Sequence, residues 1–182
     1  STRVDAFNID LANELSRNGR RSGLTFAPEG GSERMRKVIN KMVSEDDLIS
    51  TITAAFSQGW RQVKLYFMCG LPTETDEDVL GIADMAAHVI EAGRRAAGTR
   101  DIRCTISIGG FVPKPHTPFQ WVAQADPETI DNRLRLLREK IRVLERRVLD
   151  MIRHGNENVV IANRLHTWTL GLFDIASPGD LP

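Results

Sequence analysis

The chain has 182 residues, of which 41% are hydrophobic, and its 24 basic residues balance 24 acidic ones. This length and apolar content suit one compact domain, or a large piece of one, and exclude disorder as the main state. Because the formal net charge is zero, we expect no overall electrostatic attraction to nucleic acid or an anionic membrane, which leaves a local basic face open, and we expect neither as a partner. The longest nearly uncharged apolar run, residues 63–72, is far shorter than the roughly 20 residues that a membrane-spanning helix needs.

Cys69 and Cys104 are the two cysteines, and they stand far apart in the sequence. No CxxC or CxxxCxxC cluster exists, so the sequence assigns no metal ligands, and any iron–sulfur centre would need ligands from outside this chain. Two thiols without a secretion signal predict a cytoplasmic protein in which each cysteine is a small buried hydrophobe. The first residues include no initiator Met, which suggests that the numbering begins inside a longer polypeptide.

Three β-type segments, residues 22–26, 63–68 and 102–108, recur at intervals of about 40 residues, enough for parallel strands joined by crossover helices. Hydroxyl residues predict the starts of those helices, and glycines predict the ends of two of them. The predicted caps are Ser32, Ser44 and Thr75, and the predicted stops are Gly59 and Gly93. Met35, Val38, Ile39 and Met42 are expected on one face of the first helix, and residues 10–15 predict an earlier helix.

This order predicts an α/β fold, specifically a partial (β/α) barrel of TIM-like type with a long C-terminal helix. The strands alternate, which favours a barrel wall with one face on helices and the other on a polar lumen over a doubly wound sheet. We expect residues 1–125 to form the barrel part, 126–155 the long helix and 156–182 a divergent tail. In such folds the chemistry lies in loops at the carboxyl ends of the strands.

The long helix is predicted from Asp126-Pro127, an N-cap followed by proline. Its apolar residues repeat at steps of four and three, which fits packing along the outside of the barrel or another subunit. They are Ile130, Leu134, Leu137, Ile141, Leu144, Val148 and Met151. The arginines lie mostly off this seam among acidic residues, so a solvated, salt-bridged face is favoured over RNA binding.

Three loops follow the predicted strands and could carry chemistry. Gly30 and Gly31 let a backbone approach a ligand, although tight turns alone also need glycine. Gly70 has the same property in the second loop, which Pro72 stiffens. His116 lies in the third loop, where a lone histidine is more often neither ligand nor acid. A phosphate-binding barrel that uses residues 30–32 is an open alternative.

Taken together, residues 25–35 (TFAPEGGSERM), 70–75 (GLPTET) and 111–119 (FVPKPHTPF) resemble the later half of radical S-adenosylmethionine (SAM) enzymes. The similar branch often carries an N-terminal cobalamin-binding-type domain. The resemblance spans residues 2–138. It implies the fourth to sixth strands of a six-stranded partial barrel, which holds a [4Fe–4S] cluster and SAM at its mouth for reductive cleavage to a 5′-deoxyadenosyl radical.

The resemblance also implies roles for individual residues. Glu29 matches a polar position near the SAM ribose or amino group, Lys41 a basic position that pairs with the SAM carboxylate, and Arg3 a weaker candidate for the same charge. Backbone at Tyr66 to Met68 and at Phe111-Val112 matches the walls that hold the adenine. Gly70 lets its loop pass close, and Ser32 at the helix start completes the cofactor-binding set. In the alternative interpretation, Lys41 only caps its helix and Tyr66 is a core residue.

The family's CxxxCxxC loop and its glycine-rich SAM loop belong to a half that this chain lacks. We therefore expect the chain alone to be inactive, with the N-terminal half of the same enzyme or a partner chain as its partner. Any cobalamin would be bound by an absent domain. The competing hypothesis is a catalytically silent α/β interaction module that uses the Arg-rich helix.

Overall fold

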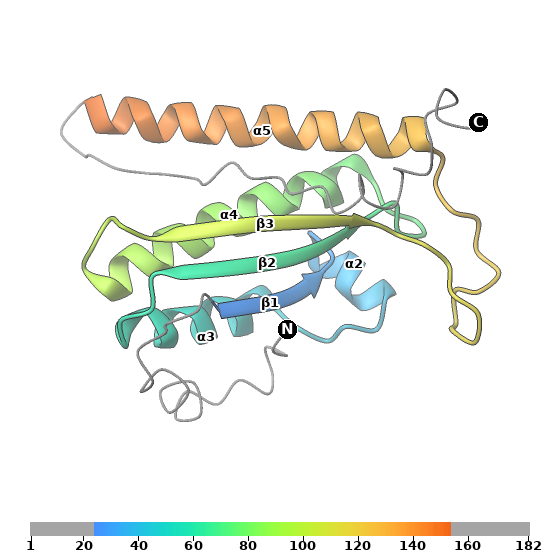
Figure 1. The fold of residues 1–182 in the computed structure, drawn as a ribbon, viewed down its shortest axis with the longest axis horizontal. Helices are drawn as coiled ribbons and strands as arrows, with labels where there is room; N and C mark the ends of the chain where they lie inside the picture. The colour runs from blue at the N-terminus through green and yellow to red at the C-terminus, as the bar shows by residue number, and fades with distance from the viewer. Residues whose placement is uncertain (1–23, 154–182) are drawn as a thin grey trace, which may run out of the picture.

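The computed structural model describes residues 24–153, with side chains up to residue 144. In chain order the elements are β1 (Leu24–Glu29), α2 (Glu33–Val38), α3 (Glu45–Ser57), β2 (Gln62–Cys69), α4 (Asp76–Ala97), β3 (Arg103–Gly110) and α5 (Pro127–Arg153). The strands form one parallel sheet in the order β1-β2-β3 (Figure 1). The α/β class is thereby confirmed. The helix predicted at residues 10–15 and the tail at 156–182 lie outside the described residues.

One face of the sheet packs on the helices. Alternate residues of each strand enter the main core, for example Phe26 in β1, Leu65 in β2 and Ile106 in β3. They meet α3, α4 and α5, and Figure 1 shows α4 passing behind β3. Residues in between, such as Lys64 and Tyr66, are half-buried on the opposite face. This alternation is the pattern that a sheet with a single helix-covered face produces.

The predicted helix starts are confirmed, because the side chains of Ser32, Ser44 and Thr75 each accept a hydrogen bond from the backbone N–H three residues later. Two predictions beyond the starts were wrong. The first helix stops at Val38, so Met42 does not share its face and is 73% exposed. The helix expected to stop at Gly93 is α4, which instead continues through Gly93 and is capped by Gly98, with φ 60°.

Gly93 is explained by packing between helices rather than by helix termination. A Cβ atom placed on Gly93 would lie 2.4 Å from Cδ2 of Phe56, the aromatic residue near the end of α3. The glycine therefore lets α3 and α4 approach closely. A glycine that serves a close approach cannot be told from a stop signal by the sequence alone.

The strands run further than predicted at their carboxyl ends. β1 continues through Pro28 to Glu29 instead of ending at Phe26, and β3 reaches Gly110. Proline has no N–H to donate to a ladder, and the register between β1 and β2 shifts between Phe26 and Glu29. Within the described residues β1 is an outer strand, which is where a proline is tolerated.

α5 packs against α4, which slopes beneath it in Figure 1, and it also contacts β2. Its predicted apolar seam is buried at Ile130, Leu134, Leu137 and Ile141, while the side chains of Val148 and Met151 lie outside the description. The helix begins at Pro127 as predicted, and its predicted end at residue 155 lies outside the described range. None of the described helices is long and apolar enough to cross a membrane.

Candidate functional site at the carboxyl ends of the strands

The exits of the three strands meet in a small apolar cluster that is separate from the main core. Met35 follows β1, Leu71 follows β2 and Phe111 follows β3, and all three are buried together. The Phe119 ring packs edge-on against Phe111, with 5.9 Å between ring centroids. Met68 also packs against the cluster. The predicted convergence of three loops is therefore present at this end of the sheet.

Glu29 and Lys41, two residues that the resemblance singled out, lie side by side. The Lys41 Nζ atom is 3.5 Å from Glu29 Oε1, and both side chains retain more than a quarter of their exposure (29% and 28%). Glu29 ends β1 in the left-handed region, with φ 69°, which few non-glycine residues adopt. Lys41 Nζ faces this carboxylate, so the lysine does not simply cap the carbonyls of α2. The pair is a partly solvated, dipolar group at the carboxyl end of β1.

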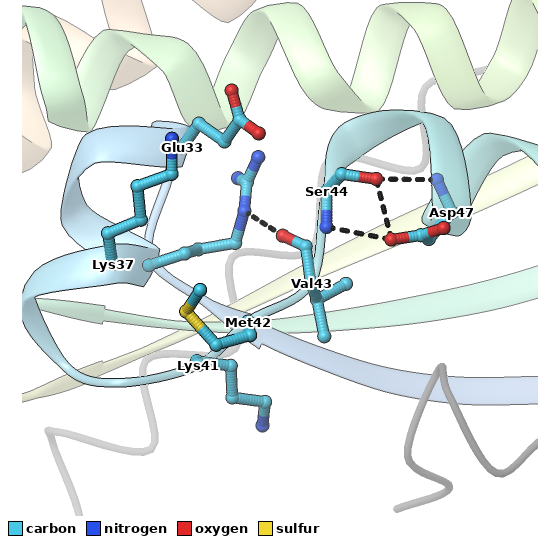
Figure 2. A pocket seen from close by; sticks show the side chains of 8 residues that line it. Glu33, Lys37, Lys41, Met42, Val43, Ser44 and Asp47 are labelled. Carbon is cyan, nitrogen blue, oxygen red and sulfur yellow. Dashed lines mark hydrogen bonds between the residues drawn. The ribbon is translucent and has the colours of Figure 1, made fainter.

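A hollow of about 150 Å³ lies between α2 and α3, and of the pair only Lys41 lines it (Figure 2). Arg36, which is 1% exposed, donates hydrogen bonds to the carbonyls of Val43 (2.8 Å) and Gly30 (3.1 Å). Burial lowers the pKa of Arg36 from its usual value. The lining residues are Glu33, Arg36, Lys37, Lys41, Met42, Val43, Ser44 and Asp47. Arg36 thereby fastens the connection that carries Lys41 to the end of β1.

Ser32, a predicted cofactor-binding residue, is engaged within the chain. Its hydroxyl donates to Asp78 Oδ1 and accepts from the N–H of Met35 at 3.1 Å. Asp78 also accepts from Arg34 and from the backbone N–H of Thr75. Burial opposes the charge on Asp78, but these hydrogen bonds outweigh burial and hold the pKa of Asp78 well below its usual range. The structure therefore gives the Ser32 side chain a role in joining α2 to α4.

The two glycines after β1 are explained by close packing within the chain, Gly31 against α4 and Gly30 against the start of α2. A Cβ atom on Gly31 would lie 2.2 Å from the Asp78 carbonyl oxygen, and one on Gly81 would lie 2.8 Å from the Gly31 carbonyl oxygen. Gly30 is confined within its own loop and helix, because its Cβ position would lie 2.9 Å from the Cβ atom of Met35. Packing within the chain therefore accounts for both glycines, and approach of a ligand or phosphate to the backbone of residues 30–32 stays a prediction.

Gly70 is likewise occupied by the chain. Its φ of 87° requires glycine, its N–H donates to Glu74 Oε2 at 2.6 Å, and its Cβ position would lie 3.2 Å from the Cβ atom of Ala125. The segment that leads into α5 therefore packs closely on one side of the Gly70 Cα atom. The carbonyl of the preceding Cys69 accepts from the N–H of Phe111 at 2.8 Å, which ties the second and third exits together.

The ion pair that fixes this loop was not predicted from the sequence. Glu74, with a side chain 1% exposed, meets Nη1 of Arg133 in α5 at 3.0 Å. Burial raises the pKa of Glu74, and the Gly70 amide and Arg133 counteract it in part. Arg133 was expected on the solvated face, yet it stands three residues after Ile130 and four before Leu137, and that spacing was the available signal.

The remaining predicted residues are dispersed around the same end. Tyr66 lies on the face of the sheet opposite the helices, with Lys64 Nζ 4.7 Å from its ring centroid. Val112 is 48% exposed beside the buried Phe111. His116, with φ 61°, is exposed on the third loop. Arg3 lies outside the described residues.

The described residues do not fit the role of cluster ligands. No group of three or more His, Cys, Asp or Glu side chains among them could hold a metal ion. Cys69 and Cys104 are buried free thiols, and burial raises the pKa of each to about 12. A metal-binding thiol must be a thiolate, which this environment opposes.

Sequence comparisons link this chain to the radical SAM superfamily and to one archaeal protein. The sequence model of the Radical SAM superfamily matches residues 1–86. This stretch is similar in sequence to radical SAM enzymes. An uncharacterized protein of Methanocaldococcus jannaschii, MJ0966, is 40% identical over 120 residues, which are 66% of this chain and 24% of that protein. The chain thus spans about a quarter of the length of this curated relative.

A solved structure shares the fold. Coproporphyrinogen III oxidase (HemN) from Escherichia coli, described as a radical SAM enzyme, superposes with a TM-score of 0.54 at 17% sequence identity. The match covers 81% of this chain and 31% of HemN. It supports the TIM-like partial barrel that the strand pattern predicted. At this level of identity the likeness concerns the fold alone.

Proposed function

We propose that this chain supplies part of the SAM-binding wall of a radical SAM enzyme. In the complete protein the bound cofactors would supply one-electron reductive cleavage of SAM, with the [4Fe–4S] cluster held by ligands outside the described residues. The single observation that carries the proposal is the Glu29–Lys41 pair at the convergence of three strand exits. Its support from sequence is the superfamily match, which includes both residues.

The chemistry of this pair suits the amino-acid part of SAM. That part carries one carboxylate and one ammonium group, and Lys41 and Glu29 carry the complementary charges a salt-bridge distance apart. Binding would exchange one internal ion pair for two intermolecular ones. Because both side chains are partly solvated, separating them costs little, and surface ion pairs are worth only about 0–1 kcal/mol.

The surroundings suit the nucleoside part. Met68 and Phe111 belong to the apolar cluster at the strand exits, and the half-exposed Val112 follows Phe111. This segment would border the adenine. The partner that completes the site would be the N-terminal half of the same enzyme or a separate chain. A cobalamin-binding domain elsewhere in the full-length protein stays a prediction of the sequence resemblance.

The test uses two ligands that differ in the amino-acid group. We expect Lys41→Met in the full-length protein to weaken SAM binding roughly tenfold or more, the loss that removal of one charge-assisted hydrogen bond produces. Binding of 5′-methylthioadenosine, which lacks the carboxylate and the ammonium group, should be unchanged. Equilibrium dialysis of both ligands measures this difference.

Lys37→Met is the matched control, because Lys37 is an exposed lysine on the neighbouring helix turn that forms no ion pair with Glu29. It should leave both affinities as in the wild type. Equal weakening of the two ligands by Lys41→Met, or no weakening of SAM, would contradict the assignment of Lys41 to the carboxylate. Glu29→Gln should follow the pattern of Lys41→Met.

A further inference from the structure

We infer that Arg133 and Glu74 are a positioning pair, through which α5 sets the backbone geometry of the second strand exit at residues 69–71 and of Phe111 beside it. The expected effect on SAM binding rests on the proposed function. The effect on the backbone does not, because it can be measured without SAM. The two ideas can therefore fail separately.

The contacts form a continuous path from α5 to the loop. Glu74 Oε2 accepts from both Arg133 Nη1 (3.0 Å) and the Gly70 N–H (2.6 Å). Arg133 also donates from Nη2 to the main-chain carbonyl of Glu74 at 2.5 Å. One rigid guanidinium thus holds the side chain and the main chain of Glu74, and that side chain holds Gly70.

The path continues from the loop to the third strand exit. The carbonyl of Cys69, directly before Gly70, accepts from the N–H of Phe111 at 2.8 Å. The Phe111 ring belongs to the apolar cluster at the candidate site. A change in the peptide plane at Gly70 would therefore be passed to the backbone that borders the proposed adenine wall.

Burial distinguishes this pair from the other ion pairs of α5. The Glu74 and Arg133 side chains are 1% and 14% exposed, whereas Arg135 and Glu139, paired at 3.4 Å along the same helix, are 61% and 54% exposed. Without Arg133, a buried carboxylate would lose its countercharge, and the turn would have to open to hydrate it. Loss of the Arg135 guanidinium should cost little stability, because water can hydrate the exposed Glu139 carboxylate. Arg135 therefore provides the matched control.

The first test is amide hydrogen exchange of the full-length protein without SAM. In Arg133→Met we expect exchange to rise by about tenfold or more at the amides of Gly70 and Phe111, with α3 unchanged, because local opening is separable from global unfolding. Arg135→Met should exchange as the wild type does. An equal rise in α3, or no rise at Gly70, would overturn the inference.

A gentler variant keeps the test informative if Arg133→Met folds poorly. Arg133→Lys retains a cation near Glu74 but loses the fork geometry that holds two oxygens. We expect its exchange at Gly70 to lie between the wild type and Arg133→Met. Exchange as slow as in the wild type would show that charge alone suffices and would overturn the role given to the second hydrogen bond.

The second test asks whether the effect passes through Gly70. Arg133→Met alone should weaken SAM binding about tenfold, a free-energy change of about 1.4 kcal/mol. The double variant Arg133→Met/Glu74→Gln leaves no unpaired charge at position 74 and keeps an oxygen that can accept from the Gly70 N–H. Its SAM affinity should therefore return to within about threefold of the wild type.

The outcomes separate the two proposals. A double variant as weak as the single one would show that Arg133 does not act through the Glu74–Gly70 bond, which overturns the positioning role. If the wild-type protein binds no SAM, the proposed function fails, and hydrogen exchange at Gly70 and Phe111 alone then decides the positioning role. A merely structural clamp would move the unfolding midpoint without this pattern of rescue.

Discussion

Two carboxylates on one short segment fasten two different strand exits, and the pKa values of the two shift in opposite directions. Asp78 joins the exit of β1 to α4 through Arg34, which precedes it in the sequence. Glu74 joins the exit of β2 to α5 through Arg133, which follows it. The pKa of Asp78 lies well below its usual range, whereas the pKa of Glu74 is raised.

The difference comes from the balance between burial and hydrogen-bond donors. Burial opposes ionisation at both residues, but Asp78 accepts from Ser32, Arg34 and Thr75, and these donors outweigh it. At Glu74 the Gly70 amide and Arg133 do not fully compensate. At the β1 junction, the attachment of the β1 exit to α4 through Asp78, several donors together stabilise the carboxylate. The β2 junction is the attachment of the β2 exit to α5 through Glu74. Among the described residues, Arg133 is the one side-chain cation that pairs with Glu74, so the attachment of the β2 exit is more sensitive to a single substitution.

The largest loss of stability is expected for Arg133→Met. We expect it to lower the free energy of unfolding by about 3 kcal/mol, the lower end of the cost of leaving a buried charge unpaired. Arg34→Met should cost clearly less, because Arg34 is half-exposed and Ser32 and Thr75 still donate to Asp78. Urea denaturation of both variants measures the difference. Equal losses would contradict the distinction between the junctions.

The β1 junction has a steric weakness rather than an electrostatic one. Gly31→Ala would place a Cβ atom 2.2 Å from the Asp78 carbonyl oxygen, so α2 and α4 must separate. Overpacking of this kind typically costs about 1–3 kcal/mol. Gly109→Ala is the matched control, because its Cβ position has no atom within 4 Å. We expect a change within about 0.5 kcal/mol there. A thermal shift in Gly109→Ala as large as in Gly31→Ala would refute the packing argument.

The sequence predicted the features that depend on near neighbours. The caps at Ser32, Ser44 and Thr75 bind amides three residues away, and the seam of α5 is a periodic signal within one helix. The sequence could not predict contacts between distant segments. Arg133 meets Glu74 across 59 positions, and the Gly93 approach to Phe56 depends on how two helices pack. For such contacts the residue types are compatible with several partners.

At the candidate site, too, the sequence predicted individual residues but not the contacts between them. The resemblance to a family selected Glu29 and Lys41 from motif positions, and their mutual contact emerged only in the folded chain. The glycines at 30, 31 and 70 were interpreted as openings for a ligand, yet neighbouring side chains and backbone fill those spaces. A glycine in a loop can mark a position where a Cβ atom does not fit, and only the tertiary structure identifies the neighbouring atom that would clash with it.

The smallest expected effect concerns Asp78 and depends on pH. A carboxyl whose folded-state pKa lies below its unfolded value of about 3.9 stabilises the protein above that value and loses this contribution as the pH falls through the folded-state pKa. Asp78→Asn removes the charge that Arg34, Ser32 and Thr75 recognise. We therefore expect Asp78→Asn to be less stable than the wild type at pH 7, with the difference constant down to about pH 4 and shrinking below it. Urea denaturation between pH 7 and 2.5 measures the two curves. A difference that instead shrinks as the pH rises would mean that Asp78 is held protonated, as burial alone would make it, and the contrast with Glu74 would be lost.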